Sequence, residues 1–210
     1  MKTDAVIFDI DGTLTNSIRP ITVSWNRHLA SLGISYTPLT KEKAASLMGK
    51  TMDAWAMAVL PDLPLSEANA IAEVMEQKEN EEILTNGTDL YPGVREIFET
   101  LSRTYDLFIL SNCGKGYIEA VMTHAGIEPY VKGHLCYADT LKDKPENLRL
   151  MIQQYDLKHP VYVGDTPHDK ACCDTVGVPF IFVSWGFGDV PDAQYRADSM
   201  YELPGVIQKL

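Results

Sequence analysis

The sequence has few basic residues and few cysteines. Its 210 residues include 18 lysines and arginines against 29 aspartates and glutamates, so the formal net charge is −11. Because no cluster of basic residues is present, we expect neither nucleic acid nor an anionic membrane as a partner. The four cysteines form no Cys-x-x-Cys pair and no zinc-type spacing with histidine. We therefore expect reduced, mostly buried thiols.

Long hydrophobic runs are missing as well. No run approaches the roughly 18 apolar residues of a membrane span, and residues 1–9 carry two aspartates where a signal peptide needs an apolar stretch. We therefore expect a cytoplasmic protein. The composition, 45% hydrophobic and 22% charged, is typical of a globular protein with a sizeable core. A small solute is the expected partner, and the expected state is a monomer or homodimer.

Short apolar runs alternate with helical patterns along most of the chain. The runs predict buried strands at residues 5–8, 107–110, 135–137, 161–163 and 180–183. Apolar residues spaced i, i+3, i+4, i+7 begin at Val94, Ile118 and Leu148 and predict helices between the later strands. This alternation predicts an α/β fold, a Rossmann-like three-layer core with a parallel sheet covered on both faces.

The segment after the first strand departs from this alternation. Residues 16–84 contain no strand-like run and predict helices at 17–32, 41–48, 51–60 and 67–83, the last capped by Ser66. Ile21, Trp25, Leu29 and Leu32 form one apolar stripe, which favours a small core of its own. We expect a core domain of residues 1–16 and 85–210 and an inserted helical cap domain of residues 17–84.

Polar residues follow several predicted strands at the points where the strands end. In an open parallel sheet these ends share one edge, where ligands bind. The candidates, together with a lysine that opens the helix before the fourth strand, are Asp9, Asp11, Ser111, Asn112, Lys144, Asp165 and Asp169.

Such a group of carboxylates favours a metal and phosphate chemistry. Uncompensated carboxylates would repel one another, and oxygen ligands favour Mg²⁺. A carboxylate nucleophile, a hard cation, a lysine and a hydroxyl suit phosphoryl transfer through an aspartyl-phosphate, with a second carboxyl group as acid and base. Ser111 and the N–H groups of a helix expected directly after Asn112 would bind phosphate. Lys144 would offset negative charge on the nucleophile and phosphate.

Four segments resemble, in chain order, the four motifs of the haloacid dehalogenase superfamily. They are Asp-Ile-Asp-Gly-Thr at 9–13, Ser-Asn at 111–112, Lys-Pro at 144–145 and Gly-Asp-Thr-Pro-His-Asp at 164–169. The helical insertion resembles the C1-type cap of that superfamily, and residues 91–94 resemble the return of the chain into the core. The resemblance therefore extends over nearly the whole chain.

The resemblance implies a role for each matching residue. Asp9 would be the nucleophile and a magnesium ligand, and Asp11 would be the general acid/base and bind the metal through its backbone carbonyl. Ser111 and Asn112 would bind the transferred phosphate, and Lys144 would hold both nucleophile and phosphate. Asp165 would ligate magnesium, and Asp169 would support it from nearby.

Asp11 also implies which reaction is catalysed. Dehalogenase members lack an acid at this position and work without magnesium, so the chain resembles the phosphatases, with phosphoglycolate-like and sugar phosphates as candidate substrates. Residues 144–147, Lys-Pro-Glu-Asn, depart from the pattern frequent in phosphoglycolate phosphatase-like members, which leaves the substrate class open.

Three alternatives remain open. A β-phosphoglucomutase-like mutase would use the same residues and return the phosphoryl group to a sugar. A phosphate-binding protein without turnover would be expected to lose an acid, and none is missing. A phospho-acceptor receiver domain is only ~120 residues long and carries its acceptor aspartate on a middle strand, where this chain has Ser111.

Two cap residues and one cysteine are weaker candidates. Lys50, in the turn after Gly49, and Arg19, near the start of the insertion, are candidate substrate contacts that are also compatible with solvated surface positions. Trp25 is expected in the cap core. Cys113 follows the phosphate-binding candidates, so its oxidation is expected to disturb the pocket, and peroxide should then inactivate the wild type and Cys113→Ser at different rates.

Overall fold

A parallel sheet forms the centre of the molecule. The computed structural model describes residues 2–210, and within them six strands form this sheet in the order β5-β4-β1-β6-β7-β8, with every neighbouring pair parallel. The strands are β1 (Ala5–Phe8), β4 (Asp106–Ser111), β5 (Val131–Cys136), β6 (Pro160–Gly164), β7 (Phe180–Val183) and β8 (Tyr195–Ala197). Their carboxyl ends therefore share one edge of the sheet.

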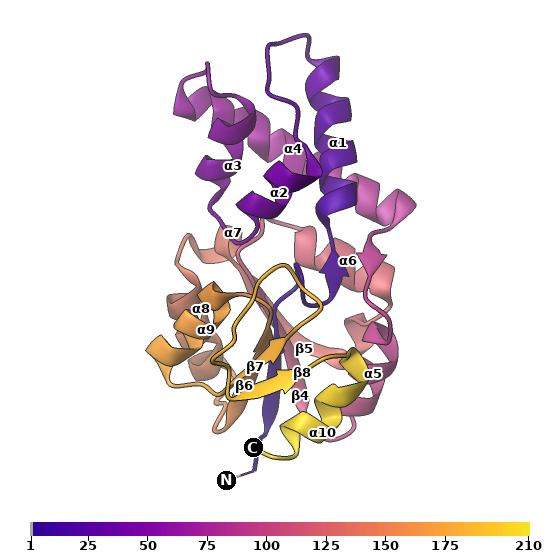
Figure 1. Cartoon of the computed structure of the whole chain (residues 1–210), viewed down its shortest axis with the longest axis vertical. Coiled ribbons are helices and arrows are strands. Elements are labelled where there is room, and N and C mark those ends of the chain that lie inside the picture. Colours follow the sequence, from indigo (N-terminus) through magenta and orange to yellow (C-terminus); the bar gives the residue numbers. More distant parts are fainter. Residues whose placement is uncertain (1) are drawn as a thin grey trace.

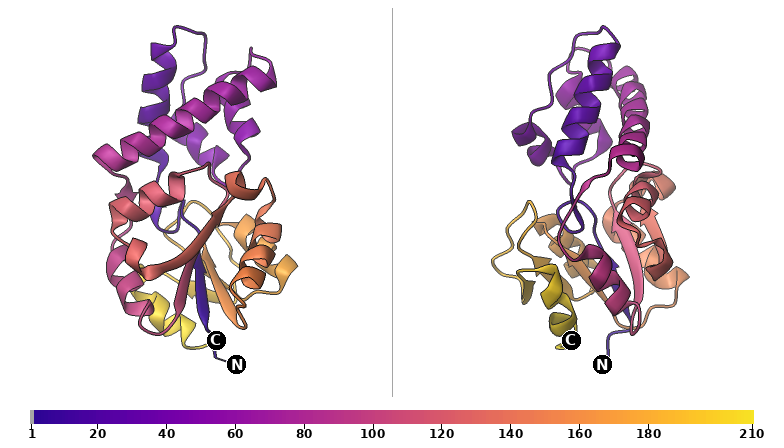
Figure 2. Two further views of the ribbon diagram at one scale, coloured as in Figure 1. Left: turned by 180° about the vertical axis from the view of Figure 1, so that it is seen from behind. Right: turned by 90° about the vertical axis from the view of Figure 1, so that its right-hand side faces the viewer.

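Helices cover both faces of this sheet (Figures 1 and 2). One face packs against α5 (Val94–Leu101), α6 (Tyr117–Ala125) and α10 (Leu203–Ile207), and the other against α8 (Lys144–Gln154) and α9 (Pro167–Val176). Val6 and Phe8 enter the first core and Ala5 and Ile7 the second, because side chains alternate along a strand. The predicted three-layer α/β core is confirmed. Short helical turns complete it at α7 (Tyr137–Thr140), η1 (Glu128–Tyr130) and η2 (Met200–Glu202).

Four further helices stand beyond the carboxyl edge of the sheet, and we call them the cap (Figure 1). They are α1 (Ile18–Ser31), α2 (Lys41–Leu47), α3 (Met52–Val59) and α4 (Leu65–Asn86). They enclose a core of their own, which includes Ile21, Trp25 and Leu29. Leu32 does not belong to the predicted stripe, since α1 ends at Ser31 and the Leu32 side chain is 46% exposed.

Two short strands connect the cap to the sheet domain. β2 (Thr15–Asn16) and β3 (Asp89–Leu90) pair antiparallel, so the two chain crossings lie side by side. The hydroxyl groups of Thr15 and Thr88 lie 2.7 Å apart and are buried. This ribbon forms the two-stranded boundary between cap and core.

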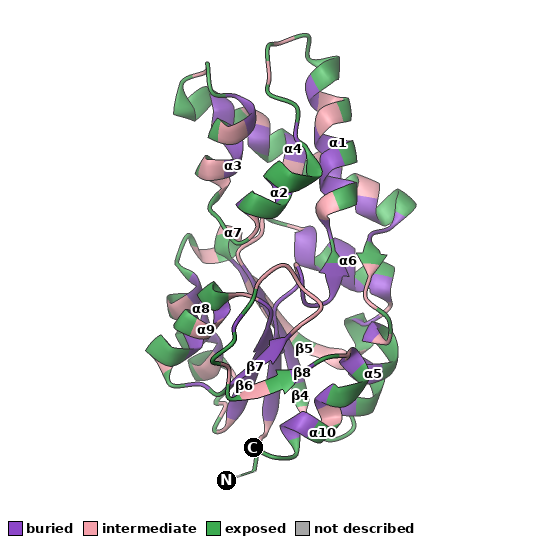
Figure 3. Ribbon diagram, viewed as in Figure 1, coloured by how far each residue is buried: buried purple, intermediate pink, exposed green. Residues whose placement is uncertain are grey.

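Several predicted boundaries were wrong for physical reasons. β5 begins four residues earlier than predicted, because it is an edge strand in which Cys136 is the one fully buried residue and the apolar signal is weak. α4 begins at Leu65 after Pro64, so Ser66 lies inside its first turn and is not its cap. β8 and α10 were not predicted, since β8 is three residues long and half exposed. Figure 3 shows the contrast between the buried central strands and the mixed surface of the cap.

Every helix in residues 2–210 is too short or too polar to cross a membrane.

Candidate active site

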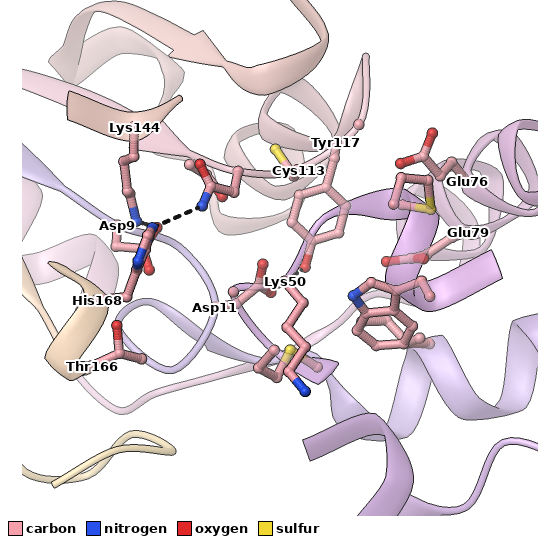
Figure 4. A pocket seen from close by; sticks show the side chains of 18 of the residues that line it. Asp9, Asp11, Lys50, Glu76, Glu79, Cys113, Tyr117, Lys144, Thr166 and His168 are labelled. Carbon is pink, nitrogen blue, oxygen red and sulfur yellow. Dashed lines mark hydrogen bonds and ion pairs between the residues drawn. The ribbon is translucent and has the colours of Figure 1, made fainter. Parts of the chain in front are cut away.

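A cavity of about 80 Å³ lies between the carboxyl edge of the sheet and the cap. The core contributes the ends of β1 and β4, the start of α8 and the loop after β6, and the cap contributes α1, the turn between α2 and α3, and α4. The residues brought together here include Asp9, Asp11, Lys50, Glu76, Glu79, Ser111, Asn112, Tyr117, Lys144, Thr166, His168 and Asp169. Figure 4 shows Asp9 and Lys144 on one side of the cavity and Glu76 and Glu79 on the other.

Asp9 and Lys144 form a buried ion pair at the core end. Lys144 Nζ lies 2.9 Å from Asp9 Oδ1 and donates to Asp169 Oδ1 at 2.6 Å, so one ammonium bridges two carboxyl groups. Burial would lower the pKa of Lys144, but the charges of Asp169 and Asp9 outweigh it and raise this pKa well above its usual value. Lys144 is therefore held as a cation beside Asp9.

The two carboxyl groups that share Lys144 have opposite pKa shifts. Burial raises the pKa of Asp9 well above its usual value, against the opposing effect of Lys144 and with the neighbouring Asp169 and Asp165 adding to the rise. Burial acts on Asp169 too, yet Lys144 and the hydrogen bonds from Thr166 hold the pKa of Asp169 below its usual value. Thr166 donates to Asp169 Oδ2 from its hydroxyl at 2.6 Å and from its backbone N–H at 3.0 Å. All this fixes Asp169 as an anion.

Asp165 lies at the end of β6 and is fully buried. Its Oδ2 accepts a 2.6 Å hydrogen bond from the backbone N–H of Phe187, whereas Oδ1 is buried and has no hydrogen-bond partner among residues 2–210. Burial, with the charge of Asp169 next in importance, raises the pKa of Asp165 to about 7. A buried carboxylate oxygen without a donor needs a positive charge beside it.

These three aspartates fit a divalent cation. One oxygen each from Asp9, Asp165 and Asp169 lie within 4.8 Å of one another. The backbone at Gly12 and Gly186 approaches Asp165 so closely that a Cβ at either position would overlap the Asp165 side chain. Gly12 also has φ +83°, a conformation that favours glycine. The donors are all carboxylate oxygens, the type that hard cations such as Mg²⁺ prefer. The orphaned Oδ1 of Asp165 is what such an ion would satisfy.

Asp11 points toward the cap, away from the Lys144 pair. Its Oδ1 accepts hydrogen bonds from Ser17 Oγ at 2.5 Å and from Tyr117 Oη at 2.6 Å. Burial raises the pKa of Asp11, although both hydroxyl donors oppose the rise. Since both donors contact Oδ1, Oδ2 is the oxygen available for a transferred proton. Sequence reasoning did not identify Ser17 or Tyr117 as partners of Asp11. The sequence shows only that a hydroxyl side chain stands at the start of the insertion and another at the start of α6.

The end of β4 carries the predicted phosphate-binding pair. Ser111 is buried, and Asn112 Nδ2 lies 3.5 Å from His168 Nε2. The expected helix N-terminus directly after Asn112 was wrong, because α6 begins at Tyr117 after a loop of four residues. His168, not selected from the sequence, lines the cavity with Asn112.

The two weaker cap candidates have different positions. Lys50 lines the cavity and is exposed at its cap side. Arg19 does not line it: Arg19 donates two hydrogen bonds to Asp89 of β3, so the structure places it at the boundary ribbon. An arginine with a carboxylate partner at the linker is not available to a substrate in the cavity.

The cap wall of the cavity is aromatic and acidic, which sequence reasoning did not anticipate. Trp25 and Trp55 have ring centroids 5.6 Å apart and line the cavity while also forming the cap core. Glu79 is 6% exposed, and its Oε2 accepts a 2.9 Å hydrogen bond from Trp25 Nε1. Burial raises the pKa of Glu79 to about 8 and that of Glu76 to about 7. A helical glutamate is usually solvated, so the sequence carried no signal for either.

Cys113 lines the cavity beside the phosphate-binding pair. Burial, followed by the neighbouring Cys136, raises the pKa of Cys113 well above its usual value. The thiolate is the form that reacts with peroxide, and burial disfavours it. The structure therefore gives a reason against the oxidation sensitivity expected from the sequence.

Known proteins match this chain in sequence and in fold. Residues 6–183 match the family described as haloacid dehalogenase-like hydrolase. A phosphoglycolate phosphatase of Rhodobacter capsulatus is 27% identical over 97% of this chain and 96% of its own length. Another, of Rhodospirillum rubrum, is 25% identical over 94% of this chain and 86% of its own length. A crystal structure described as a predicted phosphoglycolate phosphatase from Haemophilus somnus superposes with a TM-score of 0.85 at 19% identity, covering 99% of both chains.

Proposed function

The chain belongs to the haloacid dehalogenase-like hydrolases and is a phosphatase of that family, and we propose that it hydrolyses a small phosphomonoester through an aspartyl-phosphate formed on Asp9. The observation that carries the proposal is the buried Asp9–Lys144–Asp169 bridge, with Asp165 beside it and Asp11 on the side of the cap. The cavity of about 80 Å³ favours a compact ester. Since the relatives are named for phosphoglycolate, that ester and sugar phosphates are the first substrates to assay.

We assign the metal site to the carboxylates of Asp9 and Asp165 and the backbone carbonyl of Asp11, with Asp169 in support. A divalent cation bound there, which we propose to be Mg²⁺, supplies positive charge that keeps the carboxylates ionised and stabilises the phosphate oxygens. Lys144 contributes a second positive charge at the same oxygens, because it already contacts Asp9 Oδ1. Ser111 and Asn112 bind the remaining phosphate oxygens from the end of β4.

Asp9 and Asp11 divide the chemistry in the first half-reaction. A carboxylate oxygen of Asp9 attacks phosphorus, and the bond from phosphorus to the ester oxygen breaks. Asp11 gives its proton to the leaving alkoxide, for which its raised pKa suits it. The cap excludes bulk water from the cavity during this step.

The second half-reaction reverses these roles. Asp11, now a carboxylate, takes a proton from a water molecule, which attacks phosphorus. The bond between phosphorus and Asp9 breaks, so that phosphate leaves and both aspartates return to their starting states. Ser17 and Tyr117 stabilise the anionic form of Asp11 through Oδ1 during the interval.

Trapping the covalent species tests the proposal. During turnover of p-nitrophenyl phosphate with Mg²⁺, hydroxylamine should convert the acyl phosphate to a hydroxamate, and peptide mass spectrometry should locate it at Asp9. The Asp9→Asn variant should be inactive and unlabelled. Turnover without any label on Asp9, or full activity of Asp9→Asn, would contradict the assignment.

A further inference from the structure

We infer that the cap end of the cavity binds an ammonium group on the leaving alcohol, so that the preferred substrate is the phosphomonoester of a small amino alcohol. The inference rests on the proposed phosphatase function and narrows its substrate class. An amino alcohol phosphate differs from phosphoglycolate, whose leaving group carries a carboxylate. The inference also makes Glu79 and Glu76 specificity-determining residues.

Glu79 is the first observation. It is 6% exposed, one of its oxygens is held by Trp25, and Oε1 has no hydrogen-bond donor among the residues that the structure describes. Glu79 also lines the cavity, so this second oxygen is available to a ligand there. Buried carboxylates are normally paired with a cation or with several donors. An ammonium group in the cavity supplies both.

Glu76 places a second acid on the same side, one turn before Glu79 on α4. Its carboxyl group lies against Gly114, in the loop after Asn112, and a Cβ at position 114 would overlap it. Gly114 thus permits the close approach of this cap carboxyl group to the core. Figure 4 shows Glu76 and Glu79 together at the end of the cavity opposite Lys144.

The walls at this end suit a cation as well. Trp25 and Trp55 present indole rings beside the two acids. Indole faces attract ammonium and alkylammonium groups, more strongly when the site excludes water. A substrate carboxylate suits this wall poorly, because it would lose its hydration against the indole rings and be repelled by either acid in its ionised form.

No protein cation satisfies these acids in residues 2–210. The lysines that line the cavity are Lys50 and Lys144, and Lys144 is engaged by Asp9 and Asp169 at the other end. None of the ion pairs among residues 2–210 joins Lys50 to Glu76 or Glu79. Because Lys50 is exposed, water and salt screen its charge. The cavity is therefore cationic where the phosphate binds and carries two acids without a protein cation at the far end. An ammonium group bound between these acids would lower their raised pKa values and hold them as carboxylates, so the site matches a phosphate ester of an amino alcohol.

Three esters with different groups at the end of the leaving alcohol test the inference. Phosphoethanolamine carries an ammonium, propyl phosphate carries a methyl group in its place, and phosphoglycolate carries a carboxylate on a shorter chain. With the wild-type protein and Mg²⁺, kcat/KM for phosphoethanolamine should exceed that for propyl phosphate by about tenfold or more, with phosphoglycolate lowest. Equal values of kcat/KM for phosphoethanolamine and propyl phosphate, or a preference for phosphoglycolate, would overturn the inference.

Substitution of the acids assigns the preference to residues. Glu79→Gln keeps the shape and the acceptor for Trp25, and it should reduce the ratio of kcat/KM for phosphoethanolamine to that for propyl phosphate about tenfold, with Glu76→Gln causing a smaller fall. The matched control is Glu67→Gln, which removes a charge from an exposed position of the same helix and should keep the wild-type ratio. A ratio unchanged by Glu79→Gln in a folded protein would overturn the inference.

The activity on p-nitrophenyl phosphate distinguishes failure of this inference from failure of the proposed phosphatase function. Hydrolysis of that ester without any preference for an ammonium would overturn the inference alone. Failure to hydrolyse every ester, p-nitrophenyl phosphate included, would overturn the proposed function and the inference with it.

Discussion

Replacing Glu79 by glutamine should make the protein more stable at alkaline pH. The carboxyl group is buried in the cap between α4 and Trp25, and burial raises its pKa from 4.5 to about 8. In the unfolded chain the same group ionises near 4.5. Folding at neutral pH therefore requires Glu79 to take up a proton, and this requirement becomes costlier as the proton concentration falls.

The sign and size follow from the two pKa values. Because the folded-state pKa is the higher one, the contribution of Glu79 to stability is fully present below about pH 4.5 and is lost as the pH rises toward about 8. Integrating the linkage relation with these two pKa values gives a loss of about 4 kcal/mol in the free energy of unfolding between pH 5 and pH 8.5. Glutamine does not titrate and still accepts from Trp25 Nε1, so Glu79→Gln should escape that loss.

The assay is urea unfolding of both proteins across this pH range, without added substrate. The difference in free energy of unfolding, Glu79→Gln minus wild type, should increase by about 4 kcal/mol from pH 5 to pH 8.5. Taking the difference removes the contributions of the other aspartates, which both proteins share. Glu73→Gln, at an exposed position of α4, should show a nearly constant difference from wild type. Parallel curves for wild type and Glu79→Gln would refute the reasoning, since they would mean that Glu79 is ionised in the folded protein.

Four other changes address the catalytic end of the cavity. Asp165→Asn should lower turnover of p-nitrophenyl phosphate by about 10²-fold or more through loss of a metal ligand, and EDTA should abolish wild-type turnover until excess Mg²⁺ is restored; metal-independent turnover would contradict the site. Asp11→Asn should lower kcat by about 10²–10⁴-fold while the far-ultraviolet circular dichroism stays native, and unaltered turnover would remove its acid/base role. Gly12→Ala should inactivate the enzyme, because φ +83° is strained for alanine and the new methyl group overlaps the Asp165 carboxyl group; an active, normally folded variant would contradict this. Cys113→Ser and wild type should lose activity in peroxide at the same rate, since burial keeps the thiol protonated, whereas a resistant variant would restore the oxidation hypothesis.

The alternation of buried strands and helices could be predicted from the sequence. β1 and β7 have the predicted bounds, because a strand buried on both faces is a continuous apolar run that local composition reveals. The edge strands β5 and β8 were misplaced or missed for the converse reason, since partial exposure removes that signal. The three-layer α/β class could therefore be predicted from the chain alone.

The site residues at the strand ends could also be predicted from the sequence, because the carboxyl ends of parallel strands lie at one edge of the sheet however the helices pack. Asp9, Ser111 and Asp165 could be selected on that ground. What each of them contacts could not be predicted. The bridge of Lys144 between Asp9 and Asp169 depends on how α8 and α9 pack against the sheet.

The cap side of the cavity was decided by tertiary structure alone. Tyr117 reaches Asp11 across 106 positions of sequence, and Trp25 reaches Glu79 across 54. Such contacts arise where segments distant in the chain pack together, and nothing in the local pattern of a helix distinguishes a glutamate that faces a cavity from one that faces water. The sequence by itself determined the fold class and the acidic edge of the sheet, because both follow from local periodicity. The aromatic and acidic wall opposite that edge exists only when the cap helices are packed over it.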